Sequence, residues 1–311
     1  MRMKKLVNEL TWSVSRAQLF QACQRAYYYT YYGAWGGWED DASPETRKLY
    51  ILKNIKPLAM WAGSLVHSLI KDTLDEFARS GQWPETAALQ EQARNRMNAG
   101  WKEAVGREWE QYPSRRTNLF ELYYGNGRTL PAETTNALRE RVFTCLESFV
   151  MSPTVREILA LPYSSWKTND VLDTFMSNDV KVWCALDFAY IDADGICHIL
   201  DWKTGVENRI TLRQQLACYA LYAMSKWNVP LDKLSLHGVF LLDGGRKSDY
   251  PVQPELLVSV QDQIVTSSQA MRAKLRDPEK NVAEEEDFPC APSEYGCEQC
   301  SFREVCPALS R

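Results

Sequence analysis

The segment LDFAYIDADGICHILDWKTG, residues 186–205, decides the predicted fold. It spans most of two runs rich in apolar residues, 180–191 and 196–202, which the turn-forming sequence DADG separates at 192–195. Two such runs joined by a tight turn predict a β-hairpin. Side chains on each strand of a hairpin point alternately to the two faces of the sheet, so the position of a residue along the strand determines its face.

Two aspartates and a lysine lie on this hairpin. Asp187 is on the first strand, Asp201 ends the second, and Lys203 follows two positions later on the same face as Asp201. The turn can bring the two carboxylates to one end of the sheet, where a divalent cation such as Mg²⁺ or Mn²⁺ would relieve their repulsion. A metal beside a lysine can hydrolyse a phosphodiester bond. The alternative is a solvated edge hairpin, in which the three residues have no chemical role.

The sequence DWKTG, residues 201–205, resembles the core motif of the PD-(D/E)XK nucleases, above all the Asp-Tyr-Lys-Thr-Gly signature of their RecB-like branch. Trp202 stands in place of the tyrosine, and Asp187 matches the upstream metal-binding acid. Cys184 stands where the branch often has glycine, which removes no catalytic group. The resemblance implies an α/β fold with a restriction-endonuclease-like core, in which helices flank a central mixed sheet.

Two further features match the branch, which has a metal-binding histidine on an upstream helix and a Gln-x-x-x-Tyr motif after the lysine strand. His67 fits the first feature, and Gln215 with Tyr219 fits the second, four residues apart on one helical face. Taken alone, His67 on an apolar helical stripe is more typical of a packed core histidine. The resemblance implies that Gln215 and Tyr219 orient the substrate or Lys203.

The same resemblance implies a catalytic metal centre. Asp187 and Asp201 would bind magnesium or manganese, with His67 as a third ligand and the backbone carbonyl of Trp202 as a fourth. Lys203 would position or activate the attacking water.

A second cluster lies near the end of the chain, where Cys297, Cys300 and Cys306 have the spacing Cys-x2-Cys-x5-Cys. Three thiolates this close indicate a metal or cluster site, which needs a fourth ligand. Cys23 and Cys290 are the two candidates. The spacing alone cannot distinguish iron from zinc, and Cys290 would complete a zinc site confined to the tail.

The cysteine pattern resembles that of AddB and of CRISPR-associated RecB-like nucleases, in which one N-terminal and three C-terminal cysteines hold a 4Fe-4S cluster. The resemblance implies that Cys23 joins Cys297, Cys300 and Cys306 as a cluster ligand. Such a cluster would join the two ends of the chain and stabilise the fold by closing a long loop. The other four cysteines are predicted to be small buried hydrophobic residues.

Helical periodicity and turn residues predict the remaining elements. Helices are expected at about 15–33, 58–80, 86–110, 133–160, 211–227 and 254–276, a further strand at 234–242, and a loop at 34–56. The chain is expected to divide into N-terminal helices of the nuclease domain (1–80), a helical lobe (81–179), the catalytic core (180–285) and a cysteine-rich tail (286–311).

Composition limits the class of protein. The 311 residues carry a formal net charge of −4, which argues against a basic protein that coats nucleic acid non-specifically. The sequence has no run of 18 apolar residues and no apolar leader segment, so a cytoplasmic protein is expected. In that compartment nine cysteines are not expected to form disulfides.

The sequence therefore predicts a metal-dependent DNA nuclease that acts on single-stranded DNA, in DNA repair, CRISPR adaptation or phage defence. The residues leave open whether it is an exonuclease or an endonuclease. A helicase, CRISPR adaptation or defence-system protein is the expected partner. The alternative is a DNA-binding, nuclease-like subunit of a helicase or defence complex. That subunit would cut DNA only when a partner is present.

Overall fold

A computed structural model of the chain describes residues 6–125 and 129–309. Its centre is a five-stranded mixed sheet with the order β1-β2-β3-β4-β5. The strands are β1 (Trp166–Ser177), β2 (Val180–Ile191), β3 (Cys197–Lys203), β4 (Leu234–Phe240) and β5 (Arg246–Asp249). Only β3 and β4 pair in parallel, and the other neighbours are antiparallel. The α/β fold with a mixed sheet is confirmed.

The predicted hairpin is formed by β2 and β3. Phe188 pairs with Leu200, and the register continues to Ile191 and Cys197 on either side of the turn. The Asp192 carboxylate accepts hydrogen bonds from the backbone nitrogens of residues 194 and 196, and Gly195 has a φ of 75°, a conformation that glycine adopts without strain. The aspartate and glycine of the DADG sequence thus close the turn and set the register of the two strands.

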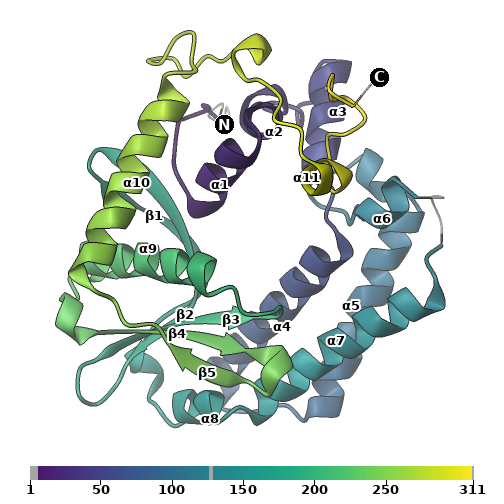
Figure 1. The fold of residues 1–311 in the computed structure, drawn as a ribbon. Coiled ribbons are helices and arrows are strands. Elements are labelled where there is room, and N and C mark those ends of the chain that lie inside the picture. The colour runs from purple at the N-terminus through teal and green to yellow at the C-terminus, as the bar shows by residue number, and fades with distance from the viewer. Residues whose placement is uncertain (1–5, 126–128, 310–311) are drawn as a thin grey trace, which may run out of the picture.

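Helices cover both faces of the sheet (Figure 1). On one face, α9 (Arg209–Trp227), α10 (Pro254–Arg272) and α1 (Val14–Ala22) pack against Cys197 and Ile199 of β3. On the other face, α4 (Leu58–Ser80), α7 (Ala132–Met151) and α8 (Pro153–Leu159) pack against Leu200 and Trp202. Asp201 therefore points to the α9 side, because it alternates with Leu200 and Trp202.

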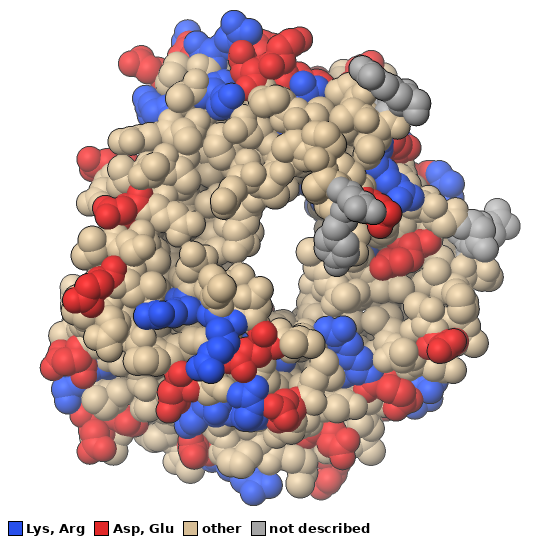
Figure 2. All heavy atoms as spheres, in the orientation of Figure 1, with Lys and Arg blue, Asp and Glu red and all other residues tan. Residues whose placement is uncertain are grey.

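The molecule has the shape of a ring (Figures 1 and 2). The sheet, α9 and α10 form one side, and α5 (Thr86–Val105), α6 (Phe120–Tyr123) and α7 form the other. The ring is closed by α1, α2 (Gln24–Tyr28), α3 (Pro44–Lys53) and α11 (Glu294–Glu298), where the first helices pack against the C-terminal tail. Figure 2 shows an opening that passes between the two sides.

The start of the chain differs from the prediction. The first helix is capped by Ser13 rather than Ser15 and ends at Ala22. After Cys23 the chain continues as α2 and a π-helical segment at Tyr29–Gly33. The predicted loop at 34–56 contains α3, which begins where the Ser43 hydroxyl accepts a hydrogen bond from the nitrogen of Thr46. Helix α3 was missed because the tryptophan, aspartate and proline residues of 34–56 resemble a loop composition.

The predicted helical lobe at 81–179 is helical only as far as α8. Its last part, 166–177, is β1, so the sheet begins before the predicted boundary at 180. Strand β1 lies at the edge of the sheet and exposes several side chains, which explains why its sequence lacks a clear apolar alternation. Strand β5 was also missed, whereas the bounds of α4 and β2 were predicted correctly.

Within the described ranges, every helix is either too short or too polar to cross a lipid bilayer.

Candidate active site and cysteine cavity

The two hairpin aspartates lie one position beyond the Phe188–Leu200 pair, on the side away from the DADG turn. Strand β3, which carries Asp201, runs toward the ring opening (Figure 1). Asp187 is 9% exposed and Asp201 is 1% exposed. Oδ2 of Asp187 accepts a hydrogen bond from the backbone nitrogen of Trp202 at 2.8 Å, which fixes this carboxylate against the neighbouring strand. The structure thus brings both predicted acids together in a largely buried position.

His67 approaches Asp187 from α4. Its Nδ1 atom lies 3.2 Å from Oδ1 of Asp187. Burial alone would disfavour a charged imidazole, but the negative charges of Asp187 and Asp201 outweigh it and raise the pKa of His67 to about 9. His67 is therefore part of an ionic network rather than a neutral core histidine.

Lys203 and Gln215 connect to Asp201. Nζ of Lys203 lies 2.5 Å from Oδ2 of Asp201 and donates a hydrogen bond to Oε1 of Gln215 at 3.1 Å. The amide nitrogen of Gln215 donates to Oδ1 of Asp201 at 2.9 Å and to the Tyr219 hydroxyl at 2.6 Å. Burial and the charge of Asp187 raise the pKa of Asp201 to about 7, although Lys203 opposes the shift. The site therefore places acid, lysine, amide and phenol in one hydrogen-bonded chain.

The donor set fits a hard divalent cation. Two adjacent buried carboxylates offer oxygen ligands, and His67 adds an imidazole beside them. As they stand, the side chains of residues 6–125 and 129–309 include no group of three or more His, Cys, Asp or Glu residues positioned to hold a metal ion. The oxygens of Asp187 and Asp201 instead contact His67 and Lys203. Trp202, whose carbonyl was predicted as a ligand, packs its buried ring on Phe149.

The sequence prediction missed Asp170, which lies on β1 next to these residues. Its pKa is raised mainly by burial and by the negative charge of Asp187, while His67 and Lys71 oppose the shift. Nothing in the local sequence pattern marks Asp170, because it lies on the edge strand that was not predicted.

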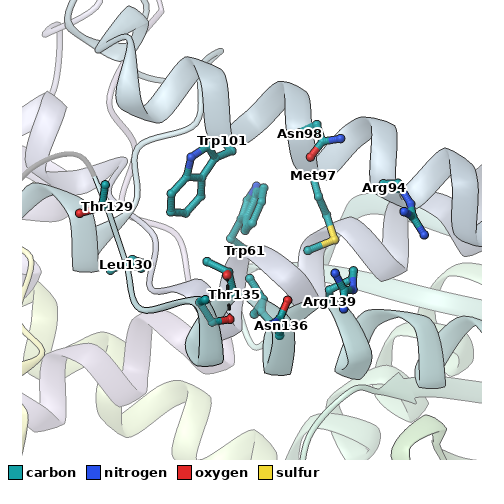
Figure 3. Close-up of a pocket in the computed structure, with 12 residues that line it drawn as sticks. Trp61, Arg94, Met97, Asn98, Trp101, Thr129, Leu130, Thr135, Asn136 and Arg139 are labelled. Carbon is teal, nitrogen blue, oxygen red and sulfur yellow. Dashed lines mark hydrogen bonds between the residues drawn. The ribbon is translucent and has the colours of Figure 1, made fainter.

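A separate pocket of about 450 Å³ lies in the helical lobe (Figure 3). Trp61 and Trp101 flank it, with Arg94 and Arg139 at its other end. A side chain at Gly63 would face Thr204, the residue directly after β3, whereas the Trp61 ring meets Gly100 of α5. The pocket and the aspartate site therefore lie on different sides of α4.

The cysteine-rich tail folds against the first helices. The predicted ligands Cys23, Cys297, Cys300 and Cys306 line one cavity of about 340 Å³, and Cys290 lines it as well. Sγ of Cys290 lies 3.8 Å from Sγ of Cys306. Both candidates for the fourth ligand are thus at the cavity, and its thiol lining fits the chemistry of an iron–sulfur cluster or of zinc.

Other contacts also hold the tail in place. Nε of Arg25 donates a hydrogen bond to the carbonyl oxygen of Phe288 at 2.8 Å, and the Tyr29 hydroxyl donates to Glu285 at 2.9 Å. A cluster would therefore not be the sole link between the two ends of the chain. The four remaining cysteines, Cys145, Cys184, Cys197 and Cys218, are buried, as predicted.

Comparison with known families agrees with this geometry. The chain matches the family model of the PD-(D/E)XK nuclease superfamily over residues 11–307. The match spans nearly all of the sequence, and the chain belongs to this superfamily. Membership indicates a nuclease, and thus a hydrolase, whose activity depends on a metal ion.

Individual relatives add little. No curated protein matches the chain. The solved structure titled "Crystal structure of SSO0001" is similar over 81% of this chain and 100% of its own, with 12% sequence identity and a TM-score of 0.29. A likeness this weak supports no conclusion about substrate or partner.

Proposed function

We propose that the protein is a magnesium- or manganese-dependent deoxyribonuclease of the RecB-like branch. The observation that carries this proposal is the continuous network from Asp201 through Lys203 and Gln215 to Tyr219, next to the His67–Asp187 pair. The residues come from α4, from the hairpin and from α9, so their convergence depends on the tertiary fold.

Each residue has a distinct role in the proposed site. Asp187, Asp201 and His67 would hold the cation, together with the Trp202 carbonyl. A bound cation supplies Lewis-acid polarisation of the phosphate and lowers the pKa of a bound water. The Lys203 ammonium, fixed by its two partners, positions that water or stabilises the developing negative charge.

The amide of Gln215 keeps this arrangement in place. It accepts from Lys203 through its oxygen and donates through its nitrogen to Asp201 and Tyr219. This leaves the lysine side chain little rotational freedom, so its charge stays beside the carboxylates. The Tyr219 hydroxyl orients Gln215 in turn.

Single-stranded DNA is the proposed substrate. Strand β3, which carries Asp201 and Lys203, runs toward the ring opening (Figure 1). A single DNA strand is flexible and can follow such a passage (Figure 2) more readily than a stiff duplex. Because the net charge of the chain is −4, its surface as a whole does not attract the DNA phosphates, so DNA must bind at a local site. DNA repair, CRISPR adaptation or phage defence is the proposed setting.

The cysteine cavity is proposed to hold a 4Fe-4S cluster through Cys23, Cys297, Cys300 and Cys306. Its role is structural, because it joins α1 and α2 to the tail. Protein purified without oxygen should be brown and contain about four irons per chain. A colourless protein that contains zinc would contradict the proposal.

A nuclease assay tests the proposed activity. Labelled single- and double-stranded DNA is incubated with the full chain, purified without oxygen, in Mn²⁺, in Mg²⁺ and in EDTA. Cutting should require the metal and should fall at least about a hundredfold in Lys203→Ala. Lys280→Ala is a matched control, because the Lys280 side chain is 80% exposed and pairs only with a neighbouring aspartate in the described structure.

If the wild-type chain cuts no DNA under any of these conditions while its cluster is intact, the proposal of an autonomous nuclease is wrong. That result would favour a nuclease-like subunit that needs a partner.

A further inference from the structure

Asp170 has an unusual backbone conformation within β1. Its φ is 50°, in the left-handed region, where aspartate and asparagine are tolerated better than most residues. Its neighbours Asn169 and Val171 pair with Phe188 and Leu186 of β2. Asp170 therefore lies directly opposite Asp187 across the two strands.

Hydrogen bonds join strand β1 to α4 next to Asp170. Nδ2 of Asn169 donates hydrogen bonds to the carbonyl oxygen of Lys71 at 3.0 Å and to Oδ1 of Asp75 at 2.8 Å. In return, Nζ of Lys71 donates to the carbonyl oxygen of Asn169 at 3.2 Å. Lys71 is one helical turn beyond His67, so the same part of α4 positions both the strand distortion and the histidine.

This placement is costly without a bound cation. Like charges opposite each other destabilise an antiparallel pair, and Asp170 and Asp187 are both at least partly buried. The nearby cations contact other acids, since Lys71 pairs with Asp75 at 2.9 Å and His67 pairs with Asp187. A positive φ at a residue whose register places it opposite a buried carboxylate indicates a functional position.

We propose that Asp170 contributes a third carboxylate to the divalent-cation site of Asp187 and Asp201. This inference rests on the metal centre of the proposed function, and it adds a residue that lies outside the superfamily motif on β2 and β3. Oxygen ligands are the class that Mg²⁺ and Mn²⁺ prefer, and a third carboxylate raises the negative charge available to hold the ion.

Manganese binding tests the inference without any DNA. Isothermal titration with MnCl₂ is performed on the full wild-type chain with its cluster intact, on Asp170→Asn and on Asp173→Asn. Asparagine keeps the tolerance for a left-handed backbone while removing the charge. Asp173, on the same strand, bonds to Tyr222 and Lys226 instead, so it is a matched control for loss of one charge.

We expect the Mn²⁺ dissociation constant to rise on the order of tenfold or more in Asp170→Asn and to stay near the wild-type value in Asp173→Asn. In EDTA, Asp170→Asn should unfold at the same temperature as the wild type or at a higher one, because a repulsive charge is gone. Weaker Mn²⁺ binding without loss of metal-free stability distinguishes a metal-site residue from one with a structural role.

Unchanged Mn²⁺ affinity in Asp170→Asn would overturn the inference, and so would weaker binding that accompanies a lower unfolding temperature in EDTA. The outcome is separable from the nuclease proposal. A chain that binds Mn²⁺ through Asp170 but cuts no DNA, with or without partners, would contradict only the proposed activity. A chain that cuts DNA while Asp170→Asn binds Mn²⁺ normally would contradict only this inference.

Discussion

Asp201 and His67 make the stability of the metal-free protein depend on pH. Burial with Asp187 raises the pKa of Asp201 to about 7, above the ordinary carboxyl value of 3.8. The pKa of His67 rises to about 9 from 6.5 against the effect of its burial, because Asp187 favours its charge. Both groups thus bind protons more tightly in the folded chain than in the unfolded chain.

The sign of the pH dependence follows from linkage. The protonation of Asp201 contributes to the free energy of unfolding fully below pH 3.8, and this contribution is lost as the pH rises through about 7. The contribution of His67 is complete below pH 6.5 and is lost as the pH rises through about 9. In EDTA the free energy of unfolding should therefore fall between pH 6 and pH 9 by more in the wild type than in His67→Gln. Thermal unfolding at both pH values measures this, and equal falls in the two proteins would contradict it.

A divalent cation should reverse this trend, because metal binding competes with these protons. The unfolding temperature gained on addition of Mn²⁺ should be larger at pH 8.5 than at pH 6. A gain that is independent of pH would show that neither Asp201 nor His67 releases a proton on binding.

At the scale of elements, the contact of α9 with the sheet sets the position of Gln215 and Tyr219. Helix α9 approaches the sheet closely at Gly238 of β4, where an added Cβ would lie 2.7 Å from Cδ2 of the buried Leu212 and 3.2 Å from the Phe240 ring. A glycine within a strand often marks such a close approach.

Gly238→Val should therefore push α9 away from β4, although valine favours strands in general. We expect a loss of about 1–3 kcal/mol in the free energy of unfolding, as for other overpacked cores, together with weaker nuclease activity. Denaturant unfolding and the DNA assay measure the two effects. Ser235→Val, on the same strand at a half-buried position, should change both only slightly.

If Gly238→Val leaves both stability and activity at wild-type values, the close approach of α9 does not govern the site.

Secondary structure was predictable where the sequence pattern is strong. The hairpin 186–205 combines two apolar runs with a DADG turn, so β2 was predicted with its correct bounds. Strand β1 escaped prediction because it is a partly polar edge strand, and α3 escaped because its cap is a single Ser-Pro step in a loop-like region. Edge strands and short helices are stabilised by tertiary contacts more than by their own sequence pattern.

At the scale of the whole molecule, the ring opening predicts that the proposed deoxyribonuclease requires a free DNA end. If the substrate passes through the opening to reach the site, it must enter by a free end (Figure 2). Linear single-stranded DNA should be degraded, whereas a covalently closed single-stranded circle of the same sequence should resist over the same period. Rapid cutting of the circle at the linear rate would show that the strand reaches the site without threading.

The cysteine cavity yields a second prediction at this scale. Cys23 and Cys290 both line the cavity, and the proposal assigns the cluster to Cys23. Cys23→Ser should therefore lose most of its iron and brown colour, whereas Cys290→Ser should keep both. Iron content after anaerobic purification measures this, and the reverse result would place the cluster within the tail.

Loss of the cluster in Cys23→Ser should lower the unfolding temperature without unfolding the chain. The hydrogen bonds from Arg25 to Phe288 and from Tyr29 to Glu285 still join the two ends.

The sequence by itself determined the hairpin, the identity of the acids and lysine on it, and the three clustered tail cysteines, because each is set by spacing over a short stretch of chain. Only the tertiary structure decided that Asp170 faces Asp187, that Cys23 and Cys290 share a cavity with the tail, and that the molecule encloses an opening. These features join residues far apart in sequence. Burial and charge contacts that form only in the folded chain stabilise these features. The local periodicity of the sequence therefore does not predict them.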